Sequence, residues 1–128
     1  MSRWIAYLSS VRGGGRDGEA RRFLALLEEY TPWIEHDGGC RAYLALGGMR
    51  RIFGHPFALL SRIQSEIARR GLPTTAGLAA NKSLSRAAAD SAAGGGAFWV
   101  FPQGEKDFLD LLRVERWTEK IAIGKTKL

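Results

Sequence analysis

The stretch TTAGLAANKSLSRAAADSAA, residues 74–93, contains a strand followed directly by a helix. Thr74 to Leu78 form a short β-prone segment, and the small-residue run from Lys82 to Ala93 is predicted to be helical. Asn81 precedes that run, where a side-chain oxygen can accept hydrogen bonds from the free amides of the first turn. Gly94 to Gly96 then end the helix. The stretch therefore predicts a strand that leads into a capped helix.

Hydrophobic spacing upstream of this stretch predicts five further elements. Apolar residues recur three and four positions apart in both expected helices, and a proline stands at the start of the second. In chain order we expect a strand at Trp4–Leu8, a helix at Glu19–Tyr30, a hairpin of Trp33–Glu35 and Ala42–Leu46 around the turn at 36–39, and a helix from Pro56 to Gly71.

Downstream, Ala97–Phe101 reads as a strand and Glu105–Leu112 as a short helix. The first six elements give the order β-α-β-β-α-β, which is typical of ferredoxin-like folds. The fold class is therefore α/β, of the α+β kind, with helices on one face of an antiparallel sheet. We expect one domain over residues 1–112 and a tail over 113–128.

The charge is concentrated in the middle of the chain. The 128 residues carry a net charge of +6, and residues 38–89 hold eight basic residues against Glu66 alone. Such a block suits a polyanion, most simply nucleic acid, although a solvated surface is the commoner explanation. The single cysteine excludes an internal disulfide, the apolar runs are too short to span a membrane, and no signal peptide is visible. A cytoplasmic protein without metal or cofactor is expected.

Three segments resemble the palm domain of the Y-family translesion DNA polymerases, the UmuC-like and DinB-like group. Tyr30–Glu35 and Gly38–Ala45 match the family's Tyr-Ser/Thr step and its Ser-Ile-Asp-Glu-Ala-Tyr-Leu-Asp hairpin, and Gly77–Ala89 matches its Gly-Ile-Ala-x-Asn-Lys segment. Residues 108–114 are similar to the passage from palm to thumb, so the resemblance implies a thumb-like remnant or tail over 113–128. The resemblance implies a polymerase-type palm.

The sequence departs from this family at the positions that carry the chemistry. The resemblance implies that two carboxylates of the hairpin hold Mg²⁺, but Cys40 and Arg41 stand in their places. The first strand lacks the third carboxylate, and Ala93-Gly94 replaces a Lys-Pro that meets the triphosphate. We also expect neither a fingers domain between the first strand and the hairpin nor a little finger. An active nucleotidyl transferase is therefore not expected.

The remaining site candidates are basic residues that could contact phosphates. By resemblance, DNA-contact candidates are Arg41, Asn81, Lys82 and Arg86, and a secondary basic set is Arg50, Arg51, Arg62, Arg69 and Arg70. The alternative interpretations are an exposed turn at Cys40-Arg41, a plain helix cap at Asn81 and a solvated helix face for Arg62, Arg69 and Arg70. Phe98, Trp99 and Phe101 are expected in the core, and Trp33 and Tyr43 in the core or as cross-strand partners.

These observations predict a non-catalytic UmuC-like accessory domain in DNA repair or translesion synthesis. It would bind DNA weakly through phosphates or dock to an active DNA polymerase. One alternative is a structural or oligomerising module that does not bind DNA. Another follows from Gly38-Gly39-Cys40-Arg41, which resembles the Gly-Gly-Asp-Glu-Phe turn of diguanylate cyclases and would indicate a degenerate domain of that kind. A fragment or remnant without activity is the third.

Overall fold

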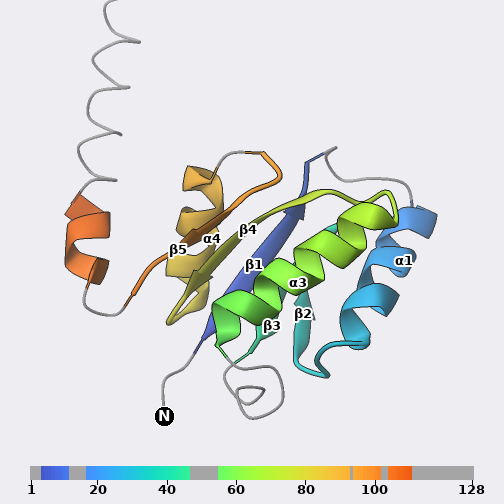
Figure 1. Cartoon of the computed structure of the whole chain (residues 1–128), viewed down its shortest axis with the longest axis horizontal. Helices are drawn as coiled ribbons and strands as arrows, with labels where there is room; N and C mark the ends of the chain where they lie inside the picture. The colour runs from blue at the N-terminus through green and yellow to red at the C-terminus, as the bar shows by residue number, and fades with distance from the viewer. Residues whose placement is uncertain (1–3, 12–16, 47–54, 93, 102–103, 111–128) are drawn as a thin grey trace, which may run out of the picture.

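A five-stranded sheet with helices on both faces forms the part of the chain that the structure describes, residues 4–11, 17–46, 55–92, 94–101 and 104–110 of a computed structural model (Figure 1). The elements are β1 (Ile5–Ser10), α1 (Asp17–Glu28), β2 (Ile34–His36), β3 (Arg41–Ala45), α3 (Pro56–Arg69), β4 (Thr74–Ala79), α4 (Lys82–Ser91) and β5 (Ala97–Trp99). Residues 105–110 are helical as well.

The strand order β2-β3-β1-β4-β5 places β1 between β3 and β4, and both of these neighbours are antiparallel to it. Tyr7 lies opposite Tyr43 on one side and Gly77 on the other. The first four strands and the helices α1 and α3 therefore have the ferredoxin-like arrangement that the sequence predicts.

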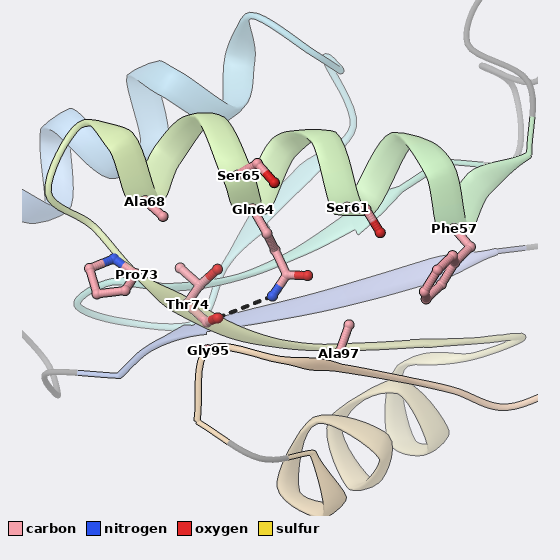
Figure 2. Close-up of a pocket in the computed structure, with 9 residues that line it drawn as sticks. All are labelled: Phe57, Ser61, Gln64, Ser65, Ala68, Pro73, Thr74, Gly95 and Ala97. Carbon is pink, nitrogen blue, oxygen red and sulfur yellow. Dashed lines mark hydrogen bonds between the residues drawn. The ribbon is translucent and has the colours of Figure 1, made fainter.

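The unit β4-α4-β5 extends this arrangement and corrects one part of the prediction. Because a helix connects them, β4 and β5 pair in parallel. The helix α4 covers the face of the sheet opposite to α3, as Figure 2 shows for the two helices above and below the strands. An antiparallel sheet with helices on one face thus describes the first six elements, whereas α4 lies on the second face and β5 is parallel.

Two apolar clusters hold these layers together. The larger one lies between the sheet and the pair α1 and α3; its fully buried members include Leu8, Phe23, Leu27, Leu44, Leu60, Ile63 and Leu78. The smaller cluster, on the α4 side, contains Ala79, Leu84, Ala88, Val100 and Phe108. Since strand residues alternate between faces, β4 supplies Leu78 to one cluster and Ala79 to the other.

Side-chain caps fix the starts of α3 and α4. His55 accepts a hydrogen bond from the Phe57 amide through Nδ1 at 3.0 Å, and Pro56 takes the first position of α3. Asn81 accepts one from the Leu84 amide at 2.9 Å. The expected helix starts at Pro56 and Lys82 are therefore confirmed.

Several aromatic side chains lie outside the predicted core. Trp33 is 64% exposed, and Phe98 and Phe101 are also exposed. Trp33 precedes the edge strand β2, while β5 is an edge strand of three residues that leaves Phe98 and Phe101 little cover. Trp99 is half-buried and packs against the larger cluster. The core prediction is thus wrong for Trp33, Phe98 and Phe101, because edge strands have a neighbour on one side only.

Candidate nucleic-acid interface

Helix α4 presents two cations toward the β2–β3 edge of the sheet. Lys82 and Arg86 are four residues apart, so their side chains lie on one side of the helix. Asn81 caps the same helix through Leu84. The side chain of Asn81 is thus used as a helix cap, whereas the side chains of Lys82 and Arg86 extend away from α4.

Each of these cations is held by a carboxylate and an aromatic ring. Lys82 Nζ forms an ion pair with Glu35 and lies 5.0 Å from the centre of the Tyr43 ring. The hydrogen bond to Glu35 raises the pKa of Lys82. Arg86 lies 3.7 Å from an Asp37 carboxylate oxygen and 5.7 Å from the Tyr7 ring centre. All four charged side chains are solvent-accessible, so breaking these ion pairs costs little free energy.

The two tyrosines form the floor beneath the cations. Tyr7 and Tyr43 face each other across β1 and β3 with ring centres 4.7 Å apart. The Tyr7 hydroxyl donates a hydrogen bond of 3.2 Å to Asp37, and a hydrogen bond to Tyr43 raises the pKa of Arg86. Arg41, two residues before Tyr43 in β3, shares this face. We call the surface made by Arg41, Lys82 and Arg86 over the two tyrosines the cationic face.

Three of the four predicted DNA-contact residues therefore lie on one surface, the cationic face: Arg41, Lys82 and Arg86. The fourth, Asn81, caps the helix that carries Lys82 and Arg86. The secondary basic set is separated from it. Arg62, Arg69 and Arg70 belong to α3 and its end, on the other side of the sheet. Arg62 bonds Glu66 one turn away at 3.1 Å. Arg50 and Arg51 lie outside the described residues, as do residues 113–128.

Cys40 and Arg41 occupy different environments although they are neighbours. Cys40 is fully buried in the larger cluster, and burial raises the pKa of its thiol. Arg41 is exposed, with Nε donating to the Gly38 carbonyl at 3.3 Å. The exposed-turn interpretation is wrong for Cys40, which lies in the turn but is buried in the core, and Arg41 is exposed but begins β3 instead of belonging to the turn.

This corner of the sheet does not suit a divalent cation. Mg²⁺ needs hard oxygen ligands, whereas the chain offers a buried thiol and a guanidinium, with Ser9 opposite Arg41 on β1. Among the residues that the structure describes, no group of three or more His, Cys, Asp or Glu side chains could hold a metal ion. Glu35 and Asp37 are bound to Lys82 and Arg86 instead.

Glu35, Asp37 and Tyr7 also belong to this site, although they were not predicted from the sequence. The available signal is positional: Lys82 and Arg86 are four residues apart on α4 and so share one of its faces, and Asp37 follows the end of β2, two residues after Glu35. Their pairing across elements depends on strand register, with Glu35 opposite Tyr43 and Tyr43 opposite Tyr7. Local spacing alone does not give that register.

The sheet, its two layers of helices and the cationic face define a palm-type domain of the kind that polymerases contain. The profile of the impB/mucB/samB family matches residues 17–90, more than half of the chain. The chain belongs to this family, the UmuC/DinB or Y-family polymerases. The resemblance stated from the hairpin and the Gly77–Ala89 segment is therefore confirmed, and the diguanylate cyclase interpretation is not needed.

Individual relatives agree with this assignment. DNA polymerase IV 2 of Mesorhizobium japonicum is 32% identical over 92 residues, which cover 71% of this chain and 22% of that protein. DinB from Sulfolobus solfataricus superimposes with a TM-score of 0.65 at 27% identity, over 73% of this chain and 28% of that one. A post-insertion binary complex of Dbh DNA polymerase gives 0.64 at the same identity and coverage. The chain spans about a fifth of the length of the curated relative that it matches.

Across the described residues, no helix has both the length and the apolar character that a membrane span requires.

The buried position of Tyr7 predicts a stability change at high pH. Burial, followed by the hydrogen bond to Asp37, raises the pKa of the Tyr7 hydroxyl above its ordinary value of 10.0. The resulting stabilisation is fully present below that value and is lost as the pH rises through the raised pKa, because the unfolded chain ionises first. Between about pH 9 and about pH 11, chemical denaturation should show a larger decrease in the free energy of unfolding for the wild type than for Tyr7→Phe. Equal losses would contradict this account of Tyr7.

Proposed function

We propose that this chain is a non-catalytic Y-family palm domain that binds DNA weakly through phosphates on its cationic face, as an accessory in DNA repair or translesion synthesis. The observation that carries the proposal is the change at the family's metal-binding hairpin. A buried thiol and an exposed guanidinium replace two carboxylates at Cys40 and Arg41. A fixed positive charge there repels Mg²⁺ but attracts phosphate.

The cationic face supports phosphate contacts rather than base readout. Lys82 and Arg86 are exposed enough to reach a polyanion, and Arg41 adds a third positive charge on the same side of the sheet. Backbone contacts of this kind carry no sequence information. With about three phosphates neutralised, affinity should fall about 40-fold between about 50 and about 200 mM salt.

The carboxylates of Glu35 and Asp37 account for the weakness we propose. Each carboxylate already forms an ion pair with a cation of the cationic face, and each would lie close to an incoming phosphate and repel it. Binding therefore requires that Lys82 and Arg86 exchange one anionic partner for another. The net gain is small, since three cations and two carboxylates leave one positive charge in excess.

Removing these carboxylates should strengthen DNA binding. For the double variant Glu35→Gln with Asp37→Asn, we expect the affinity for a labelled primer–template to rise about tenfold at low salt, because Lys82 and Arg86 lose their competing partners. Fluorescence anisotropy measures the affinity. The matched control is Glu66→Gln, which removes an acid from α3 on the other side of the sheet. An equal rise in that control would indicate a general charge effect, and no rise in the double variant would contradict the proposed site.

Docking to an active DNA polymerase or to another copy of the chain is the second candidate function. Trp33, 64% exposed beside the edge strand β2, favours it because large exposed aromatic side chains commonly mark protein contacts. Size-exclusion chromatography with light scattering tests self-association. A dimer that Trp33→Ala disrupts, and that DNA does not dissociate, would favour the interaction module over DNA binding.

A further inference from the structure

A cavity lies on the α3 side of the sheet, away from the cationic face. Its volume is about 360 Å³, and it opens between α3 and the strands β4 and β5 (Figure 2). This volume is within the range of sites that hold small organic ligands. Its location at the edge of the sheet separates it from the residues assigned to DNA contact.

The walls of the cavity combine uncharged polar groups with apolar side chains. Helix α3 contributes the hydroxyls of Ser61 and Ser65 and the amide of Gln64, and Phe57 contributes an aromatic ring at one end. Among the residues that the structure describes, no Asp, Glu, Lys, Arg or His lines the cavity. An anion or a cation would therefore lose its hydration without gaining a partner of opposite charge.

Gln64 holds the floor of the cavity in place. Its Nε2 donates to the Thr74 carbonyl at 3.1 Å and to the Gly96 carbonyl at 3.0 Å, so it ties together β4 and the segment before β5. Because the amide nitrogen is bound in this way, the orientation of the amide is fixed. The amide oxygen then lies on the Phe57 side, where Figure 2 shows it within the space between helix and strands. It offers a fixed acceptor to a ligand.

Two buried polar atoms next to this cavity have no hydrogen-bond partner within the part of the chain that the structure describes: Thr74 Oγ1 and Trp99 Nε1. Thr74 is 2% exposed and lines the cavity, with its side chain directed toward α3 in Figure 2. Trp99 follows the lining residue Ala97 by two positions in β5 and stacks on Phe57 at 5.0 Å. A buried hydroxyl without a partner is costly, and a bound molecule could supply that partner.

We propose that this cavity binds an uncharged, hydrogen-bonding heterocycle, of which a nucleoside is the representative class. The heterocycle lies between α3 and the β4–β5 edge. It accepts a hydrogen bond from Thr74 Oγ1 or donates one to it, and it donates a second hydrogen bond to the Gln64 amide oxygen. A nucleotide phosphate is disfavoured, because no cation lines the space within the described part of the chain. The site is independent of the cationic face and of the DNA binding proposed there.

Titration of the full chain with adenosine, thymidine, cytidine and guanosine, followed by amide chemical shifts, tests the proposal. We expect saturable shifts at Thr74 and Ala97 for at least one nucleoside, and weaker binding of the matching 5′-monophosphate. Absence of saturable shifts for all four, shifts confined to the α4 side of the sheet, or equal affinity for the monophosphate would overturn it.

The variant Thr74→Val separates ligand binding from folding. Valine keeps the shape and removes the unpartnered hydroxyl, so stability should be unchanged or higher while nucleoside affinity falls about fivefold. The control Thr31→Val alters another buried threonine, whose hydroxyl donates to the Ala45 carbonyl and accepts from the Trp33 amide. It should lower stability and leave nucleoside affinity unchanged. Unchanged affinity in Thr74→Val would overturn the assigned contact.

Discussion

Replacing Gly77 with alanine should destabilise the chain by about 3 kcal/mol or more, at the upper end of overpacking effects. A Cβ at this position would lie 2.1 Å from the Ser85 carbonyl oxygen and 2.3 Å from the Ala89 amide nitrogen. Both are backbone atoms of α4, so no side-chain rotation can relieve the contact. To admit even a methyl group, α4 must move away from β4 and disturb the cationic face that Lys82 and Arg86 form.

Gly18→Ala is the matched control for that substitution. Gly18 lies in α1, and a Cβ there would meet no atom within 4 Å. Alanine should stabilise this helix by up to about 1 kcal/mol. Urea denaturation of both variants gives the comparison. A Gly77→Ala chain as stable as the wild type would show that α4 does not pack this closely on the sheet.

Restoring the family's acids should damage the fold rather than rebuild a metal site. In Cys40→Asp, a carboxylate would replace a fully buried thiol in the larger apolar cluster, at a cost of about 3 kcal/mol near neutral pH. Burial would raise the pKa of the new carboxyl above its unfolded value near 3.9. The ionisation penalty is therefore full above the raised folded pKa, shrinks as the pH falls from there toward about 3.9, and is absent below it, because the carboxyl is then neutral in both states.

Arg41→Glu separates charge from burial in this experiment. Arg41 is exposed, so the single variant should change stability by no more than about 0.5 kcal/mol. Electron paramagnetic resonance with Mn²⁺ then measures metal binding by the wild type and the Cys40→Asp, Arg41→Glu double variant. We expect no specific binding by either chain. Tight binding by a stable double variant would show that the hairpin still provides metal geometry and would contradict the assignment of residue 40 to the core.

The elements that could be predicted are those whose signals are local. The apolar stripe of α3, Pro56 at its start and the Asn81 cap of α4 each lie within one element, and the structure confirms them. The place of α4 on the second face could not be read in the same way. It depends on Gly77, because the lack of a side chain there lets the backbone of α4 approach β4 closely, and the spacing of residues within α4 does not reveal that contact.

The site was predicted in its cations but not in their partners. Arg41, Lys82 and Arg86 carry the charge block and the family resemblance, and the structure brings them to one surface. Glu35 and Asp37 had no role in the sequence analysis, because their meeting with α4 depends on tertiary packing across three strands. Trp33 was misassigned for a related reason: nothing local to it indicates that its strand is at the edge of the sheet.

Affinity for primer–template DNA, measured by anisotropy across a salt series, tests the central claim most directly. The wild-type chain should bind at low salt with affinity that falls steeply as salt rises, and Lys82→Gln with Arg86→Gln should weaken binding about 100-fold and flatten the salt dependence. Arg69→Gln with Arg70→Gln removes the same charge from α3 and should cost no more than about threefold. Absence of binding by the wild type at low salt, or an α3 variant that loses as much affinity as the α4 variant, would contradict the account.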